Sequence, residues 1–492
     1  MMEVKPLRGV GNLEKFLIHQ HLVKFYNNVQ VACIYTLCNT TPALVNNDIR
    51  GLIFTALGKT VERHPILGIA LTDEASPQPS FKRLDQIDLR EIVHFVEADP
   101  ADLSAVDARI QDEHQKPFNR TQDLPLWRCE VIKSSASKDT TTFALSFSFH
   151  HVVGDGLSGA AFHRTFRNAL NGLIESGETS PSAFSKPEII QVPKLDLVPH
   201  LEESMDLPLT ALFMLTKAFK TYLYSSTDTL EWSGPPIQDA LPPVSNTRTF
   251  YLPQSVVKDL RNGCRKHQAS ITALVTVLVA RILGVLYPTH SRFIASVPFS
   301  LRKFSKHSPD DMGCFTAIAE PCFSADKSLP WGYISCRAST AHAAETASAD
   351  DNKIWKAASE CKDFIHKRSS SSENLSVGLT KFVSDYRQHF LGMLGGRRRH
   401  AFNVTNIGVV DGEISSVAGL EKQKAAFDRV VFSAGASTSG SPYTVCLASA
   451  KDGYMSITLD WEKGVVEDSS AGELSASLEK ELNRLAEAER DV

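Results

Sequence analysis

The chain has 492 residues, 42% of them hydrophobic and 22% charged, and a formal net charge of -4 at neutral pH. This length suits two domains of ordinary size, and this composition is typical of a soluble globular protein. The mild acidity argues against a nucleic-acid partner, and no apolar stretch approaches the roughly 20 residues that span a bilayer.

The ends of the chain and its cysteines favour the cytosol. Met1 to Pro6 contain no apolar signal core, and Arg490 to Val492 match no retrieval signal. The nine cysteines are odd in number, scattered and without a Cys-x-x-Cys pair, which predicts neither a disulfide framework nor a metal site. We therefore expect a cytoplasmic monomer without bound metal.

The first half of the chain alternates helical and strand patterns, which is typical of a mixed α/β protein. The expected elements are a helix over Gly51–His64, a strand to Ala70, extended chain over Ile87–Val96, a helix over Asp102–Gln115, and strands over Trp127–Ile132 and Thr141–His150. Ser176–Lys194, with its Ser, Pro and Gly, then predicts a surface connection.

An apolar helix precedes the middle of the chain. Leu207–Tyr224 carries only Lys217 and Lys220 as charges. Such a helix most often covers a core, which we favour over the alternative of a membrane-surface helix. Ser225–Val244 is rich in Pro, Ser and Asp and indicates a crossover. We therefore expect an N-terminal domain over 1–225, a linker over 226–246 and a C-terminal domain over 247–492.

The second half combines helices with several late strands. Ser270 is predicted to cap a buried helix that runs to Leu286. The other expected elements are strand Thr247–Leu252, helix Ser255–Lys266, strands Arg292–Phe299, Phe402–Val409, Arg429–Ala434, Tyr443–Ala448 and Tyr454–Trp461, and an exposed terminal helix Ala471–Arg490.

The most informative residues are His150, His151 and Asp155, which directly follow an apolar strand. Gly154 and Gly156 break that strand, and a Gly- and Ala-rich helical segment follows. Such a strand-to-helix corner exposes side chains to a substrate. Histidine, whose pKa is ordinarily about 6.5, takes and returns a proton near neutral pH. His151 is therefore our candidate general base, which would deprotonate an alcohol or amine that attacks an activated acyl group.

The alternative for a histidine at a strand end is a satisfied core or surface residue. Here the doublet, the spacing to Asp155 and the glycines on both sides of that aspartate agree, so we favour catalysis. Asp155 itself is expected to hold the turn rather than to transfer protons. No Gly-x-Ser-x-Gly nucleophile elbow is present, which favours direct attack without a covalent acyl-enzyme.

The run from His150 to Gly156 resembles the HHxxxDG signature of the superfamily that includes chloramphenicol acetyltransferase, the plant BAHD enzymes, peptide-synthetase condensation domains and the fungal alcohol acetyltransferases. The chain is most similar to the last group. Further similarities are Gly11–Phe16, Tyr26–Val31, Arg63–Gly68, Pro125–Arg128, Trp232–Pro235 and Asn403–Gly408. They cover nearly the whole chain. The Asp-Phe-Gly-Trp-Gly element of the plant branch is absent, which argues against a plant-type enzyme.

The resemblance implies two chloramphenicol-acetyltransferase-like domains, each a mostly β sheet covered by helices, with the active-site tunnel between them. It implies that His151 is the catalytic histidine, with His150 as its packing neighbour and Gly156 completing the motif. It also implies an internal ion pair of Asp155 with an arginine of the second domain. Arg302, after a strand end, is our candidate, and a solvent-facing arginine is the alternative.

The developing oxyanion of an acyl transfer needs fixed hydrogen-bond donors. Asn406 and Thr405 are our first choice, because their segment resembles a Ser-Asn-x-Gly run of the alcohol acetyltransferases. Ser437, Thr438 and Ser439 resemble a run of the carnitine and choline acyltransferases and are the second choice. A polar hairpin loop is the alternative for that second run.

No glycine-rich phosphate loop is present. The resemblance therefore implies that acetyl-CoA is a co-substrate held in the tunnel, and that no cofactor is bound permanently. Gly395–His400 is a candidate contact for its phosphates, although such basic loops are usually solvated. The expected function is acetyl transfer from acetyl-CoA to the hydroxyl of an alcohol or secondary metabolite. A carrier-protein-dependent condensation-type enzyme and a non-catalytic binding protein of the same fold are the alternatives.

Overall fold

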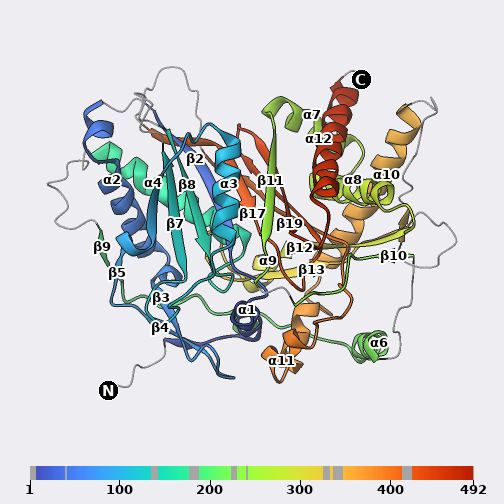
Figure 1. Cartoon of the computed structure of the whole chain (residues 1–492), viewed down its shortest axis with the longest axis horizontal. Helices are drawn as coiled ribbons and strands as arrows, with labels where there is room; N and C mark the ends of the chain where they lie inside the picture. The colour runs from blue at the N-terminus through green and yellow to red at the C-terminus, as the bar shows by residue number, and fades with distance from the viewer. Residues whose placement is uncertain are drawn as a thin grey trace.

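A computed structural model describes residues 7–38, 42–133, 142–176, 188–222, 230–239, 242–324, 333–335, 347–412 and 424–490. Two large sheets lie side by side, one formed mainly by the first half of the chain and one by the second, with helices packed around them (Figure 1). This is the mixed α/β architecture that the sequence predicts.

The first half carries helices α1 to α6 and strands β1 to β9. Their bounds are β1 Arg8–Gly9, α1 Asn12–Leu22, β2 Val29–Cys38, α2 Pro42–Arg63, β3 Ile69–Thr72, β4 Ser80–Arg83, β5 Gln86–Asp88, β6 Val93–Glu97, α3 Leu103–His114, β7 Trp127–Lys133, β8 Thr142–Phe149, α4 Gly156–Ser176, β9 Ile189–Gln191, α5 Leu201–Ser204 and α6 Ala211–Tyr222.

The second half carries strands β10 to β19 and helices α7 to α12. Their bounds are β10 Glu231–Trp232, β11 Ser245–Leu252, α7 Gln254–Lys266, α8 Ile271–Leu286, β12 Arg292–Ser300, α9 Arg302–Ser305, β13 Thr316–Ala319, β14 Cys322–Ser324, β15 Tyr333–Ser335, α10 Ala347–Ser369, α11 Tyr386–Leu391, β16 Phe402–Val410, β17 Lys424–Ser433, β18 Tyr443–Ala450, β19 Met455–Glu462 and α12 Asp468–Arg490.

The first sheet has the order β17-β2-β8-β7-β6. The apolar face of β8 is fully buried, and Phe147 stacks on Phe162 of α4 with ring centroids 3.7 Å apart. The opposite face is small and polar, and α3 covers it: Nε2 of Gln30 in β2 donates to the carbonyl of Ile110 at 2.9 Å. The alternation of β8 therefore packs its large apolar side chains against α4 on one face and its small side chains toward α3 on the other.

The second sheet contains β11-β19-β18-β16-β12-β14-β15, with β10 and β13 paired to β12. Helix α8 is largely buried against it, and the predicted cap is confirmed: Ser270 Oγ accepts the backbone N–H of Ala273 at 3.2 Å. Helix α12, expected as exposed, buries one face, including Leu474, Leu478, Leu482 and Leu485. The leucine spacing of three or four residues places these side chains on one stripe of the helix.

Strand β17 joins the two halves. It belongs to the second half of the sequence, yet it pairs antiparallel with β2 in the first sheet, with Phe432 beside Val31. A division of the chain at the predicted linker, 226–246, therefore leaves one strand of the first sheet in the second half. The exact domain boundaries stay a prediction, and residues 226–229, 240 and 241 lie outside the described residues.

Helix α6 lies at one edge of the molecule (Figure 1), where Leu212 and Leu215 are 76% and 68% exposed. The side chains of Lys217 and Lys220 lie outside the described residues, so the membrane-surface alternative stays a prediction. In the described part of the chain no single helix is long and apolar enough to cross a membrane. Helices α7 and α8 meet these two criteria only when they are taken together, and the pair is bent by 94°.

Candidate active site

The loop between β8 and α4 carries His150, His151 and Asp155 to the junction of the two sheets. Asp155, the last loop residue before α4, is held by the second half of the chain: its backbone N–H donates to the carbonyl of Gly313 at 3.3 Å. Gly156 is required by close packing: a Cβ there would lie 2.5 Å from Cγ2 of Ile407 in β16. The loop is therefore locked against both halves of the chain.

His151 lines a pocket of about 370 Å³ between the halves. Its Nδ1 lies 3.0 Å from the carbonyl oxygen of Gly154, which fixes the tautomer, because Nδ1–H must donate to that carbonyl. Nε2 is then the unprotonated nitrogen. It has no hydrogen bond to the described residues and is not among the buried unpaired atoms, so it is open to the pocket. Such a nitrogen is suited to accept a proton.

Burial lowers the pKa of His151 below its ordinary value, and the hydrogen bond to Gly154 and the charge of Asp155 only partly oppose that shift. Cys314 lies against the same ring edge, with Sγ 3.4 Å from Nδ1 and donating to the His151 carbonyl at 3.4 Å. The thiol of Cys314 has its pKa raised by burial. His151 is therefore neutral near pH 7, and its neighbour is an uncharged thiol.

Asp155 and Arg302 form a bidentate ion pair that joins the two halves. Nη1 of Arg302 donates to Oδ2 of Asp155 at 2.6 Å, and Nη2 donates to Oδ1 at 3.0 Å. The carboxylate also accepts the backbone N–H groups of Ser158 and Phe315 at 3.1 and 3.2 Å. Asp155 borders the pocket but is only 2% exposed, so its oxygens serve this pair and not a substrate.

His150 points away from the pocket. It is 1% exposed, and its Nδ1 accepts the backbone N–H of Val152 at 3.0 Å. Its Nε2 belongs to a buried cluster with His21 and Glu74, whose ligand-type atoms lie within 4.8 Å of one another. Nε2 of His21 likewise accepts a backbone N–H, from Phe118 at 3.1 Å. In each neutral ring the other nitrogen, Nε2 of His150 and Nδ1 of His21, therefore carries the proton. A protonated ring nitrogen has no lone pair for a metal ion, so this arrangement does not fit a metal site.

The second half lines the pocket through one face of β16. Asn403 and Thr405 border the pocket, as the period of two of a strand requires. Asn406 does not, which corrects its assignment as an oxyanion donor. Its Nδ2 donates to Oγ1 of Thr272 at 3.0 Å, and its Oδ1 accepts the N–H of Gly408 at 2.7 Å. Asn406 therefore fixes the end of β16 against α8.

In the Ser-Thr-Ser run after β17, one residue lines the pocket and the other two do not. Ser437 lines the pocket, and its Oγ accepts a hydrogen bond from Nε2 of Gln20 at 3.2 Å. Thr438 is fully buried, and its backbone N–H donates to the carbonyl of Phe25 at 2.9 Å. Ser439 is not among the lining residues. The run is therefore a structured loop that contributes one hydroxyl to the pocket.

The basic run Gly395–His400 is tied to the protein. Arg398 is 2% exposed and pairs with Glu462 at 3.1 Å, while Arg399 pairs with Glu320 at 2.7 Å. Arg397 likewise pairs with Glu231 at 3.2 Å. Buried Arg398 therefore holds loops together, whereas Arg397 and Arg399 are exposed, as the solvated-loop interpretation expects. The candidate contact of this run to phosphates stays a prediction.

Sequence reasoning missed a residue that shapes the pocket wall. Asp460 of β19 is 1% exposed, and its Oδ2 accepts the backbone N–H groups of Ala434 and Gly435 at 3.0 and 3.1 Å. Its Oδ1 accepts the hydroxyl of Ser433 at 2.8 Å. Tyr26, another lining residue, donates to the carbonyl of Ala434. No motif marks Asp460, because its partners lie far away in the sequence.

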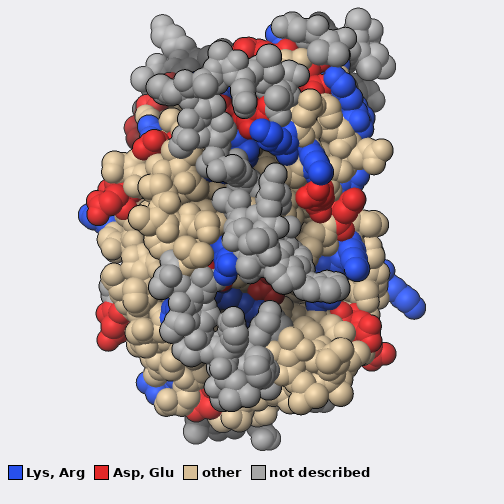
Figure 2. Space-filling view, turned by 90° about the vertical axis from the view of Figure 1, so that its right-hand side faces the viewer, with Lys and Arg blue, Asp and Glu red and all other residues tan. Residues whose placement is uncertain are grey.

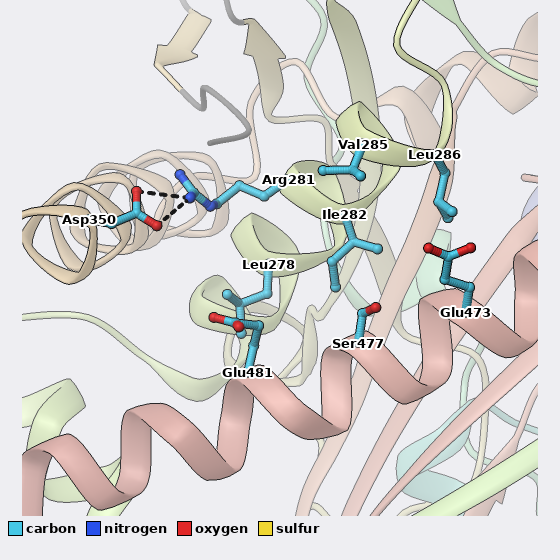
Figure 3. A pocket seen from close by; sticks show the side chains of 9 residues that line it. All are labelled: Leu278, Arg281, Ile282, Val285, Leu286, Asp350, Glu473, Ser477 and Glu481. Carbon is cyan, nitrogen blue, oxygen red and sulfur yellow. Dashed lines mark hydrogen bonds and ion pairs between the residues drawn. The ribbon is translucent and has the colours of Figure 1, made fainter. Parts of the chain in front are cut away.

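A second cavity of about 210 Å³ lies between α8 and α12. Figure 3 shows that Arg281 is turned away toward Asp350, to which it donates at 2.8 and 3.0 Å. The other lining residues are Leu278, Ile282, Val285, Leu286, Glu473, Ser477 and Glu481. This lining contains no histidine or cysteine, so we place the chemistry in the pocket of His151. Among the described residues on the face of the molecule in Figure 2, acidic and basic side chains are interspersed and form no continuous basic surface of the kind that binds nucleic acid.

Comparison with known proteins decides the family. A family model described as alcohol acetyltransferase matches residues 9–297, which is more than half of the chain. The chain belongs to the alcohol acetyltransferase family. It is therefore an acyltransferase, as the HHxxxDG-like run at His150 to Gly156 predicts.

Relatives and solved structures agree with this family. The probable alcohol acetyltransferase crmB of Aspergillus fumigatus is 28% identical and aligns over 93% of this chain and 95% of its own length. The probable alcohol acetyltransferase FCK4 of Fusarium pseudograminearum is 22% identical, over 94% and 91%. The trichothecene 15-O-acetyltransferase TRI3 of Fusarium sporotrichioides has a TM-score of 0.65 at 12% identity, covering 97% of this chain and 94% of that one.

A starter condensation domain of rhizomide synthetase RzmA, solved with C8-CoA and Leu-SNAC, has a TM-score of 0.58 at 13% identity, covering 97% of this chain and 93% of that one. Both structural matches cover nearly all of this alcohol acetyltransferase. They establish the expected two-domain chloramphenicol-acetyltransferase-like fold.

Proposed function

We propose that this acyltransferase transfers an acetyl group from acetyl-CoA to the hydroxyl of an alcohol or secondary-metabolite acceptor, by direct attack and without a covalent acyl-enzyme. The observation that carries the proposal is the anchoring of His151 Nδ1 on the Gly154 carbonyl, which leaves Nε2 as a base in a pocket lined by both halves. The CoA-bound condensation domain of the same fold supports an acyl-CoA donor.

The proposed reaction needs one base and one oxyanion site. Nε2 of His151 takes the proton of the acceptor hydroxyl, and the oxygen attacks the thioester carbonyl carbon. The tetrahedral intermediate then expels the thiolate of coenzyme A, which receives the same proton back from the imidazolium. The Asp155–Arg302 pair holds the loop in place throughout and exchanges no proton.

Thr405 is the proposed oxyanion donor, with Ser437 as the further hydroxyl in the pocket. We expect Thr405→Val to lower kcat by about 100-fold, because one fixed donor to the oxyanion is lost while the side-chain shape is kept. Thr405→Ser keeps the hydroxyl and should retain most of the rate. Equal loss in both variants, measured by steady-state kinetics, would show that the hydroxyl is not the donor.

The lowered pKa of His151 sets the expected pH profile. A general base works only when neutral, so activity is lost as the pH falls through its pKa. Since burial lowers that pKa from its ordinary value of about 6.5, we expect the acidic limb of kcat/KM to lie below pH 6.5. A limb above that value would contradict a base whose pKa is lowered by its surroundings.

The purified protein tests the proposed function directly. Acetyl-CoA is incubated with a panel of mono-alcohols and diols, and both free thiol and acetylated product are measured. Thiol release that requires the acceptor and yields its acetyl ester supports the proposal. Release without an acceptor, or acylation only from an acyl group bound to a carrier protein, would contradict it. The expected cytoplasmic location and monomeric state stay predictions.

A further inference from the structure

A row of polar side chains crosses the floor of the active-site pocket. Ser296 of β12 is in register with Asn403 of β16, and Asn403 is in register with Thr444 of β18. All three line the pocket, at one level of three neighbouring strands. We call Ser296, Asn403 and Thr444 the polar row. It lies beside Thr405, two residues farther along the same face of β16.

The polar row has no partners within the described protein. None of its three side chains forms a hydrogen bond with the described residues, and Oδ1 of Asn403 is buried and unpaired. Ser296 and Thr444 are only 8% and 9% exposed. An unpaired buried polar group costs about 1–3 kcal/mol, so buried polar groups are nearly always paired. Oδ1 of Asn403 is such a group, and the hydroxyls of Ser296 and Thr444 lie beside it in the pocket lining, so the row offers groups that a ligand can pair.

The side chains that line the pocket indicate which substrate, acetyl-CoA or the acceptor, the polar row contacts. The residues that line the pocket include no lysine or arginine, so the phosphates of coenzyme A lie elsewhere. The volume of about 370 Å³ suits a small molecule and the thioester end of its donor. We assign the polar row to the acceptor, and the KM for acetyl-CoA of variants in the row tests this assignment.

We propose that the polar row binds a second polar group of the acceptor, so that the acceptor class is a compact polyoxygenated molecule, such as a diol, rather than a simple aliphatic alcohol. This inference rests on the proposed function. A second hydroxyl fits because it can pair with the side-chain amide of Asn403 and accept from the hydroxyl of Ser296 or Thr444. Pairing it there orients the reacting hydroxyl toward His151.

The test compares cyclohexanediol with cyclohexanol, together with the other diols and matching mono-alcohols of the panel. We expect the wild-type kcat/KM for a diol to exceed that for its mono-alcohol by about 10-fold, as one good hydrogen bond provides. Asn403→Leu removes the acceptor oxygen at similar volume and should collapse that ratio toward unity. Thr444→Val should reduce the ratio, and Thr444→Ser, which keeps the hydroxyl, should preserve it.

Other outcomes overturn the inference. The inference is wrong if the wild-type enzyme prefers mono-alcohols. It is also wrong if the variants raise the KM for acetyl-CoA and leave the ratio of kcat/KM for diol and mono-alcohol unchanged, because the row would then not bind the acceptor. In both cases thiol release still occurs, so the proposed function stands. Absence of thiol release with every acceptor would instead overturn the proposed function and this inference together. Thermal melting of each variant separates loss of selectivity from loss of folding.

Discussion

Replacing His151 with alanine should lower kcat by a factor on the order of 100 to 10000, while the protein stays folded. The reason is that the variant loses a base whose free Nε2 opens to the pocket where we propose that the acceptor binds. His151 is partly exposed and packs little of the core, so the melting temperature should change only slightly. Steady-state thiol release and thermal unfolding measure the two quantities.

His150→Ala is the matched control. His150 is buried, faces the cluster with His21 and Glu74, and does not line the pocket. Its removal should therefore cost more stability and less activity than removal of His151. If His151→Ala keeps most of its rate, or if His150→Ala is the more damaging change to kcat, the assignment of the base is wrong.

Asp155→Ala should lower the free energy of unfolding by about 3 to 5 kcal/mol, because it leaves the guanidinium of Arg302 buried without its counter-charge. Activity should fall as well, since the same carboxylate holds the turn after His151 through Ser158 and the backbone of Phe315. Denaturant unfolding followed by fluorescence gives the free energy.

An exposed ion pair provides the comparison. Asp310, 53% exposed in its side chain, pairs with Arg164 at 2.7 Å, and Asp310→Ala should cost no more than about 1 kcal/mol. In a double-mutant cycle, Asp155→Ala combined with Arg302→Ala should be less destabilising than the sum of the two single changes. Strict additivity would mean that the two side chains do not stabilise each other in solution.

The local structure of this chain could be predicted because it depends on residues that are close together in the sequence. The apolar pattern over Thr141–His150 predicted strand β8, and the glycines around Asp155 predicted the turn that follows it. Ser270 predicted the start of α8, since a cap acts on the first turn of its own helix. The ordered similarities along the chain predicted the family, the fold and the role of an acyltransferase.

Asn406 shows where that reading stops. The motif drew attention to Asn406, but the strand period of β16 turns it toward Thr272 and turns Asn403 and Thr405 toward the pocket. The expected alternation of Phe402–Val409 would have put Asn403 and Thr405 on one face, yet it does not say which face meets the pocket. That choice depends on α8, which packs on the other side.

Patterns of a few residues were enough to predict the corner that carries His151, the strands and helices around it and the acyltransferase family. Three features follow only from the packing of the whole chain: β17 crosses to the first sheet, Asp460 holds the pocket wall, and Ser296, Asn403 and Thr444 share one row. Each of these contacts joins segments distant in the chain, and such pairings follow from the global packing of two sheets rather than from any local pattern.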